Sequence, residues 1–271
     1  MNDFKTIFFF DLDGTLLTDD KTISAATRTA LLEYVLDGNH VAVCTGRGLD
    51  NVIDVSGKLG LDFPGTYLIC FNGGIIYECD TKKVISRIGI PLKYIPGLFE
   101  LASEHGIHCH TYASDHMITP DEGEEMKYYN RIIQRPLVVT QDIAGNLTED
   151  PCKVIAIELH DADKLERFKQ AVDEKYGDVF TTCYSNPYYL EIYMKESGKG
   201  SAVKRLAEYL DVPISNTYAA GDEMNDISMI EAAGCGIAMI NASDEVKAHA
   251  DVITKTDNNR DGLAELIRSA I

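Results

Sequence analysis

The sequence has little positive charge for its size. Its 25 Lys and Arg residues face 43 Asp and Glu residues, so the formal net charge is -18. This excess of negative charge repels nucleic acid and anionic membranes, and we expect neither as a partner. The acidic residues are typical of a solvated surface. An anionic ligand would therefore depend on cations gathered at one site.

Disulfide patterns, repeats and long apolar runs are also missing. The seven cysteines, an odd number, are scattered without a Cys-x-x-Cys pair, which is typical of reduced thiols. No apolar run is long enough to cross a bilayer, and the chain starts without a basic, hydrophobic leader. We therefore expect a cytoplasmic protein. Because 271 residues exceed the usual size of one domain, we expect two domains.

The most informative stretch lies near the N-terminus, where an apolar run leads into two carboxylates. Residues 7–10, Ile-Phe-Phe-Phe, predict a strand that is buried on both faces, as in parallel sheets. Asp11 and Asp13 follow at the carboxyl end, where such sheets bind ligands, and Gly14 permits a sharp turn. Carboxylates two residues apart in an extended chain point the same way and repel each other. A cation, a proton or strong hydrogen-bond donors must compensate them.

Three further segments place polar side chains after apolar ones. Residues 41–47, Val-Ala-Val-Cys-Thr-Gly-Arg, predict a short strand that ends at the hydroxyl of Thr45. Lys199 opens a helical pattern over residues 201–210. The apolar residues 217–220 precede Gly-Asp-Glu-Met-Asn-Asp. Each segment alone is weak evidence, because turns and capped helix starts use the same residues.

Together and in this order, the four segments resemble the motifs of the haloacid dehalogenase superfamily of phosphotransferases. The resemblance implies an α/β fold, in which an α/β cap domain is inserted into a Rossmann-like, doubly wound parallel sheet. It also implies a Mg²⁺-dependent phosphatase that forms an aspartyl phosphate. The C-terminal segment, including Asn225 to Ile230, resembles the Cof-type branch. Members of that branch hydrolyse small phosphate monoesters such as sugar phosphates, nucleotides and cofactor phosphates.

The resemblance implies a role for each matching residue in the reaction. Asp11 would be the nucleophile, and Asp13 would be the general acid and base. Lys199 would hold Asp11 and neutralise the phosphoryl oxygens, which the Thr45 hydroxyl also binds. Superfamily ATPases that preserve the aspartyl phosphate have Thr where this chain has Asp13. The intermediate should therefore be hydrolysed quickly.

The resemblance also implies a metal site and a substrate site. The expected Mg²⁺ ligands are Asp11, the backbone carbonyl of Asp13 and Asp222, and Asp226 and Asn225 are expected beyond them or bound to the ion through water. The expected substrate-binding residues are Leu12, Gly46, Arg47, Asn72 and Asn225. The substrate would be a small phosphorylated metabolite.

The spacing of the motifs locates the second domain. About 150 residues separate Arg47 from Lys199, far more than one crossover helix needs, whereas one helix over residues 24–37 fills the earlier interval. We expect a catalytic core at residues 1–83 and 194–271 and a mobile, specificity-determining cap at residues 84–193. The expected hinges are Thr81–Ser86 and Glu196–Gly198. The candidate cap residues for substrate contact are His108, His110, Tyr128, Arg131, Tyr188 and Glu191.

Two alternatives stay open at this point. Phosphosugar mutases share the cap position and the motifs, but they usually need several cap arginines, and Arg131, Arg135 and Arg167 are the main ones here. A binding protein without activity would have no need to keep the acidic motif residues together with Lys199. We expect a monomer or a weak homodimer.

Two local features need separate interpretation. His105, His108, Cys109, His110 and His116 could suggest a transition-metal site. However, the alternation of residues 107–112 puts His108 and His110 on one face of a strand and Cys109 on the other, which favours an ordinary strand. Ile240 stands where the family usually has Gly, so we expect a local conformation without positive φ.

Overall fold

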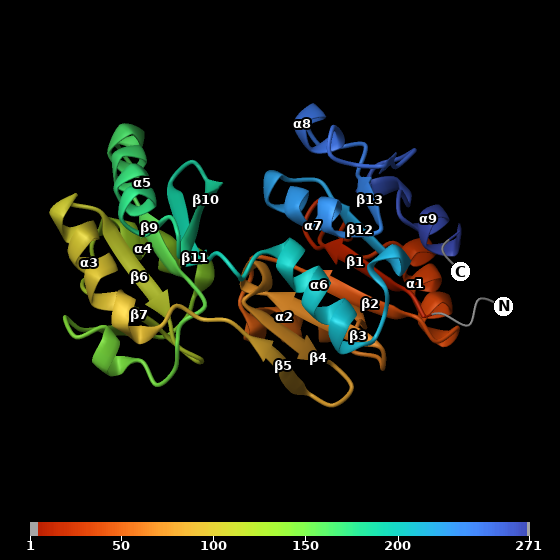
Figure 1. The fold of residues 1–271 in the computed structure, drawn as a ribbon, viewed down its shortest axis with the longest axis horizontal. Coiled ribbons are helices and arrows are strands. Elements are labelled where there is room, and N and C mark those ends of the chain that lie inside the picture. Colours follow the sequence, from red (N-terminus) through yellow and green to blue (C-terminus); the bar gives the residue numbers. More distant parts are fainter. Residues whose placement is uncertain (1–4, 270–271) are drawn as a thin grey trace. The chain divides into compact units, whose positions relative to one another are not determined.

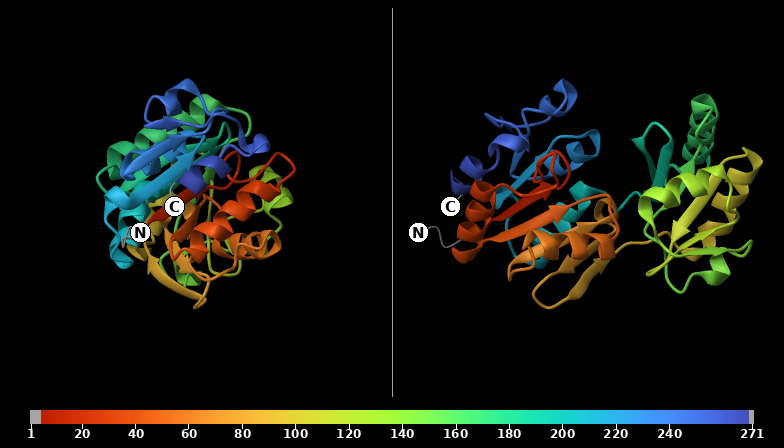
Figure 2. Two further views of the ribbon diagram at one scale, coloured as in Figure 1. Left: turned by 90° about the vertical axis from the view of Figure 1, so that its right-hand side faces the viewer. Right: turned by 180° about the vertical axis from the view of Figure 1, so that it is seen from behind.

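The computed structural model describes residues 5–269, which form two compact units. The first unit comprises residues 5–87 and 198–269, and the second comprises residues 88–197. Each unit has its own β-sheet with helices beside it (Figure 1 and Figure 2). Within residues 5–269, no helix combines the length and the apolar character needed to cross a membrane.

The first unit is built on an eight-stranded sheet. Its strand order is β14-β13-β12-β1-β2-β3-β4-β5. The strands from β14 to β3 are parallel, and β4 and β5 form an antiparallel edge. The strands are β1 (Ile7–Asp11), β2 (His40–Cys44), β3 (Thr66–Cys70), β4 (Ile75–Glu78), β5 (Lys83–Arg87), β12 (Thr217–Gly221), β13 (Cys235–Ala238) and β14 (Val252–Ile253).

The order of the strands reverses on either side of β1. The chain moves outward through β2 and β3 on one side, and through β12, β13 and β14 on the other. This is the doubly wound α/β arrangement that the sequence predicted, and its ligand crevice lies at the carboxyl ends of the strands where the order reverses. Asp11 is the last residue of β1 and therefore lies at that point.

Strand β1 is buried on both faces, as its apolar run predicted. Its side chains alternate between two layers of helices. Phe9 belongs to a core cluster with Val203 and Leu206 of α6 (Lys199–Tyr209). Phe8 packs edge-on against Tyr34 of α1 (Ala25–Leu36), with ring centroids 6.2 Å apart. Covering both faces removes water from the strand and fixes the position of the carboxylate at its end.

The helices of the first unit connect and cover these strands. They are α1 (Ala25–Leu36), α2 (Leu49–Leu59), α6 (Lys199–Tyr209), α7 (Ile227–Ala232), α8 (Asp244–Lys247) and α9 (Ala264–Ser269). The hydroxyl of Ser24 caps α1 by accepting a hydrogen bond from the backbone N–H of Thr27, at 3.1 Å. Gly38 follows the end of this helix with φ +89°, a conformation that favours glycine.

The second unit has a six-stranded sheet in the order β10-β11-β9-β6-β7-β8. All neighbouring strands are antiparallel except β7 and β8. The strands are β6 (His108–Tyr112), β7 (Met117–Thr119), β8 (Leu137–Val139), β9 (Val154–Ile157), β10 (Phe180–Asn186) and β11 (Tyr189–Met194). The helices are α3 (Ile95–Glu104), α4 (Glu124–Ile133) and α5 (Ala162–Tyr176).

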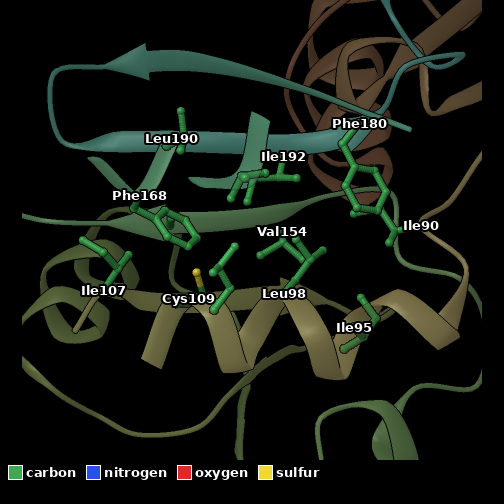
Figure 3. Packing of buried hydrophobic residues seen from close by; sticks show 14 of the residues in the cluster. Ile90, Ile95, Leu98, Ile107, Cys109, Val154, Phe168, Phe180, Leu190 and Ile192 are labelled. Atoms are coloured by element: carbon green, nitrogen blue, oxygen red, sulfur yellow. The ribbon is translucent and has the colours of Figure 1, made fainter. Parts of the chain in front are cut away.

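The two faces of this second sheet differ in character. On one face, side chains of α3, α5 and the strands form an apolar core that includes Leu98, Val154 and Phe168 (Figure 3). On the other face, the ring centroids of His110 and of Tyr129 on α4 lie 4.4 Å apart. Alternate residues of β6 therefore serve two different layers, as the period-two pattern predicted.

The chain passes between the units at positions that differ slightly from the expected ones. The second unit spans residues 88–197 rather than 84–193. The physical reason at the first boundary is that β5 pairs with β4 and so stays in the first sheet. The segment Thr81–Ser86, expected as a hinge, therefore lies in the β4–β5 hairpin and does not cross between units.

Ile240 is not among the described residues with positive φ, and its backbone N–H donates to the Thr254 hydroxyl at 2.9 Å.

Candidate active site

Asp11 lies at the carboxyl end of β1 and is 8% exposed. The chain then turns at Gly14, which has φ +85°. A Cβ atom at Gly14 would also overlap the carboxylate of Asp222. Both the backbone conformation and the lack of space therefore require glycine at this turn. The turn brings the loop after β1 against the loop after β12.

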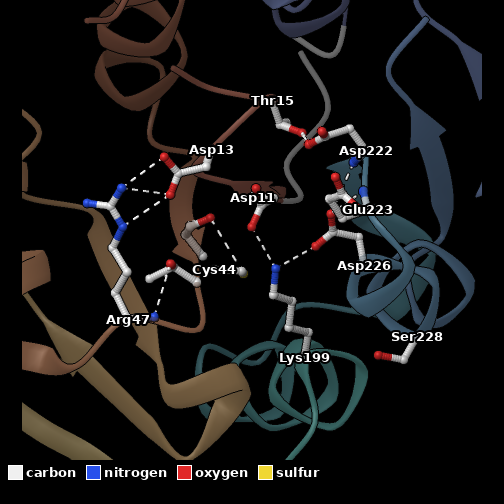
Figure 4. Close-up of polar contacts among 12 residues, drawn as sticks. Asp11, Asp13, Thr15, Cys44, Arg47, Lys199, Asp222, Glu223, Asp226 and Ser228 are labelled. Carbon is white, nitrogen blue, oxygen red and sulfur yellow. Dashed lines mark hydrogen bonds and ion pairs between the residues drawn. The ribbon is translucent and has the colours of Figure 1, made fainter. Parts of the chain in front are cut away.

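Lys199 is fully enclosed and points between two carboxylates. Its Nζ atom lies 2.6 Å from Oδ1 of Asp11 and 2.5 Å from Oδ1 of Asp226 (Figure 4). Burial raises the pKa of Asp11 to about 7, although the positive charge of Lys199 opposes this shift. Burial alone would lower the pKa of Lys199, but the two carboxylates raise it above its ordinary value. Lys199 is therefore a permanent cation that fixes the orientation of Asp11.

Both carboxylate oxygens of Asp226 accept hydrogen bonds from other groups of the protein. Besides accepting from Lys199, it accepts hydrogen bonds from the backbone N–H groups of Asp222 and Glu223, each at 3.0 Å. It belongs to a capping box at the start of the short 3₁₀ helix Met224–Asp226 and is completely buried. This geometry favours a role in holding Lys199 and the loop after β12.

Asp222 is held by a hydroxyl that the sequence analysis gave no role. The Thr15 hydroxyl donates to Oδ1 of Asp222 at 2.6 Å (Figure 4). Burial raises the pKa of Asp222 to about 6, against the effect of this hydrogen bond, and the negative charge of Asp226 raises it further. Ligand oxygens of Asp11, Asp222 and Asp226 all lie within 4.8 Å of one another, which makes this the one group of three metal-ligating side chains among residues 5–269.

Asp13 has two cationic partners. Nη2 of Arg47 lies 2.8 Å from each carboxylate oxygen, its Nε lies 3.1 Å from Oδ2, and Nζ of Lys21 lies 2.8 Å from Oδ1. Partial burial would raise the pKa of Asp13, but the hydrogen bonds and charges of Lys21 and Arg47 lower it below its ordinary value. The side chain is therefore ionised in this arrangement. Lys21, which adopts φ +57°, was not predicted as a site residue.

Thr45, Gly46 and Asn72 meet at the ends of β2 and β3. The backbone carbonyl of Thr45 accepts a hydrogen bond from the N–H of Asn72 at 3.0 Å, and a Cβ at Gly46 would lie 3.2 Å from Oδ1 of Asn72. Asn72 is buried with φ 54°. Leu12 is buried in the core, so its side chain is out of reach of a ligand. Asn225 is exposed in the 3₁₀ helix after β12.

The structure separates the six cap candidates into two groups. His108, His110 and Glu191 are at most 8% exposed, and Glu191 is paired with the buried Lys153 at 3.0 Å. These three were candidates for substrate contact, and in the structure their side chains are buried. Tyr128 and Tyr188 face each other, with ring centroids 6.4 Å apart, and together with Arg131 they retain accessible surface. The alternation of residues along the strand identified the face that His108 and His110 share. It did not identify the side chains that pack over this face.

Comparison with known proteins agrees with this architecture. The family model for haloacid dehalogenase-like hydrolases matches residues 8–267. The 5-amino-6-(5-phospho-D-ribitylamino)uracil phosphatase YwtE of Bacillus subtilis is 32% identical and covers 95% of both chains. The pyridoxal phosphate phosphatase YbhA of Escherichia coli is 32% identical and covers 97% of both chains. A haloacid dehalogenase-like hydrolase structure from Bacteroides thetaiotaomicron has a TM-score of 0.84 at 27% identity, covering 98% of this chain and 100% of that chain.

These matches extend over nearly the whole chain and include the strands that carry the acidic residues. The family model begins within β1 and ends within α9. The resemblance that the four motifs indicated is therefore confirmed. The chain belongs to the haloacid dehalogenase-like hydrolases, in their Cof-type branch, and is a phosphoric monoester hydrolase.

Proposed function

We propose that this enzyme is a Mg²⁺-dependent phosphatase that hydrolyses small phosphorylated metabolites through an aspartyl phosphate on Asp11. The observation that carries the proposal is the position of Asp11. Its carboxylate lies at the carboxyl end of the central strand and is held by Lys199 at 2.6 Å, with Asp222 in the same cluster. A fixed carboxylate beside a cation is the arrangement that attack on a phosphoryl group requires.

The reaction would proceed in two displacements. In the first, a carboxylate oxygen of Asp11 bonds to phosphorus, the ester P–O bond breaks, and Asp13 gives a proton to the leaving oxygen. In the second, water attacks the phosphorus while Asp13 takes a proton from it, and the bond between phosphorus and Asp11 breaks. Lys199 and the Thr45 hydroxyl would stabilise the charge on the phosphoryl oxygens.

For the first step, Asp13 must acquire a proton that its present partners disfavour. Arg47 and Lys21 hold it as a carboxylate. An incoming phosphate group offers these cations a stronger anionic partner, because arginine pairs well with phosphate oxygens. Transfer of Arg47 to the substrate would remove one of the two cationic partners that lower the pKa of Asp13. Substrate binding would in this way prepare the acid.

The donor set fits a hard divalent cation. Burial raises the pKa of Asp11 to about 7 and that of Asp222 to about 6, and the negative charge of Asp226 raises both further. Oxygen ligands of this kind suit Mg²⁺. Asp11, Asp222 and the backbone carbonyl of Asp13 would hold the ion, and Asp226 would orient Lys199 and the loop. When bound, Mg²⁺ would neutralise charge between Asp11 and the phosphoryl group.

Substrate choice is proposed to reside in the second unit, because the motif residues of the first unit address only the phosphoryl group. Tyr128, Arg131 and Tyr188 are the accessible candidates. The named activities of the two relatives concern phosphate monoesters of small metabolites. We propose a substrate of that class.

We also propose that the enzyme is located in the reducing cytoplasm, which its seven free cysteines support.

Turnover of p-nitrophenyl phosphate by the purified full chain tests this function. Asp11→Asn should reduce kcat by at least about a thousandfold, because it removes the attacking oxygen. Asp54→Asn is the matched control, since Asp54 is an exposed residue of the same unit whose contact is a surface pair with Lys58 at 2.6 Å. Activity of the Asp11→Asn variant close to that of the control would refute the proposal.

A panel of phosphorylated metabolites would then define the substrate class. Comparison of kcat/KM values before and after Tyr188→Ala should show a changed ranking of esters, while p-nitrophenyl phosphate turnover changes little. A requirement for a sugar bisphosphate activator would identify the mutase alternative instead. Tight ligand binding without turnover of any ester would identify the binding protein.

A further inference from the structure

The loop that carries Asp13 is held by side chains from the C-terminal part of the first unit. This loop joins β1 to α1 and spans residues 12–24. Three asparagine side chains form hydrogen bonds with its backbone, and they belong to Asn241, Asn258 and Asn259. Between 227 and 241 positions separate each asparagine from its partner. The loop is therefore fixed by contacts between segments that are distant in sequence.

Asn258 makes the most deeply buried of the three contacts. Its side-chain amide donates to the backbone carbonyl of Leu17 at 2.7 Å, and both residues are buried. The N–H of Leu17 in turn donates to the carbonyl of Leu12 at 2.9 Å, and Leu17 forms an isolated β-bridge with Asp13. Because a buried carbonyl needs a donor, the amide of Asn258 fixes the backbone segment that lies beside Asp13.

Asn241 holds the chain on the other side of Asp13. Its side-chain amide donates to the backbone carbonyl of Gly14 at 2.9 Å. Gly14 has φ +85°, a conformation that glycine adopts at little cost, so a hydrogen bond at this residue limits the freedom of a permissive turn. Both neighbours of Asp13 in the sequence are therefore tied to the C-terminal segment, Gly14 directly and Leu12 through the chain of contacts from Asn258.

Asn259 serves as an acceptor and not as a donor. Its Oδ1 atom accepts a hydrogen bond from the backbone N–H of Asp19 at 2.9 Å. In the same turn, the N–H of Lys21 donates to the carbonyl of Thr18 at 2.9 Å, and the Lys21 side chain reaches Asp13. The backbone partners define the orientation of each amide, because a carbonyl requires the nitrogen and an N–H requires the oxygen.

We propose that Asn241 and Asn258 are positioning residues of the phosphatase reaction, which hold the Asp13 carboxyl where it can give its proton to the leaving oxygen. Their role rests on the proposed function, in which Asp13 is the acid. Both act through the loop backbone, at Gly14 and Leu17. Because a shift of about 1 Å in a catalytic group can cost about a hundredfold in rate, a loosened loop should impair proton transfer. Esters whose leaving group needs a proton should be affected most.

The dependence of kcat/KM on the leaving group tests the proposal, measured for the full chain with Mg²⁺ and ring-substituted phenyl phosphates. p-Nitrophenolate is a stable anion that leaves with little help, whereas the more basic p-methoxyphenolate leaves more readily with a proton. Asn258→Asp keeps the size of the side chain but removes the N–H donor. It should lower kcat/KM at least about tenfold for p-methoxyphenyl phosphate and less than about threefold for p-nitrophenyl phosphate. Asn241→Ala should change the ratio of the two values in the same direction.

Asn259→Asp is the matched control for Asn258→Asp. It makes the same change of charge at the neighbouring position but keeps an oxygen that can accept from Asp19. The ratio of the two kcat/KM values should therefore stay within about twofold of the wild-type ratio. A smaller fraction of folded enzyme lowers kcat/KM equally for all esters and does not change the ratio. An unchanged ratio in Asn258→Asp and Asn241→Ala, or an equal change in both aspartate variants, would refute the proposal.

Hydrogen exchange tests the contact of Asn258 without any measurement of activity. In Asn258→Asp the N–H of Leu17 should exchange at least about tenfold faster than in the wild type, because the segment opens more often. In Asn259→Asp its rate should stay within about twofold of the wild-type rate. Equal rates in the wild type and in Asn258→Asp would contradict the positioning role alone. Absence of ester turnover by the wild type would refute the proposed function, and the positioning role with it.

Discussion

Replacing Asp11 by Asn should raise the thermal stability of the metal-free enzyme at neutral and alkaline pH, although it removes the proposed nucleophile. Lys199 carries one positive charge, whereas its buried partners Asp11 and Asp226 carry two negative charges. The Asn variant leaves a balanced pair of Lys199 and Asp226, and the amide oxygen can still accept from Lys199. The unbalanced buried carboxylate is therefore a cost to the folded state.

The pKa of Asp11 gives the size and the sign of this cost. Its value rises from 3.8 to about 7 on folding, so the folded protein binds more protons than the unfolded chain between these pH values. The free energy of unfolding therefore falls as the pH rises from about 4 to about 7. At about 1.4 kcal/mol for each pH unit, the full effect above pH 7 is about 4 kcal/mol. Relaxation of the buried site around the charge leaves about half of this effect, which gives a rise in Tm of about 4–8 °C.

The assay is thermal unfolding in EDTA at pH 4 and pH 8, followed by circular dichroism. Asp11→Asn should exceed the wild type in Tm at pH 8, and the difference should vanish at pH 4, where Asp11 is protonated in the folded wild type. Asp54→Asn should change Tm by less than about 2 °C at both pH values, because exposed ion pairs contribute little. A Tm for Asp11→Asn equal to or below that of the wild type at pH 8 would refute the reasoning.

Three other changes test the surrounding groups. Thr15→Val removes a hydrogen bond to Asp222, and the Mg²⁺ concentration for half-maximal turnover should rise about tenfold; an unchanged requirement would contradict the metal site. Lys21→Ala removes a donor that lowers the pKa of Asp13, so the alkaline limb of kcat against pH for an alkyl phosphate should move to higher pH. An unmoved limb would argue against Asp13 as the acid. Turnover should be lost in EDTA and restored by Mg²⁺. Ca²⁺ should not restore it, because its looser coordination disturbs the in-line geometry of the reaction. Full activity in EDTA would exclude the metal.

The sheet and the position of the acidic residues could be predicted because they depend on local patterns. The four apolar residues before Asp11 point alternately to the two faces of the strand, so other elements must cover both faces. Phe8 and Phe9 indeed pack into opposite layers. Parallel strands place their carboxyl ends at one edge. The order of motifs therefore brought Asp11, Thr45 and Asp222 to the same region without any knowledge of contacts.

The partners of those residues could not be predicted in the same way. Lys21 reaches Asp13 only because the loop after β1 folds back, with Lys21 itself at φ +57°. In the second unit, His110 is on the predicted face, but the ring of Tyr129 on α4 covers it. Such cover comes from packing between segments that are distant in sequence. Periodicity identifies the face of a strand and says nothing about what lies on it.

The charges at the strand ends connect the geometry with the proposed reaction. Four carboxylates, Asp11, Asp13, Asp222 and Asp226, meet three cations, Lys199, Arg47 and Lys21, and the exposed Glu223 adds to the negative excess. In a chain with a net charge of -18, such a site repels a phosphate dianion. A divalent cation would reverse the local sign and make the site attractive to phosphate. Burial is the main cause of the raised pKa values of Asp11 and Asp222, and the negative charge of Asp226 raises both further, so a cation at this site would offset part of the cost to stability.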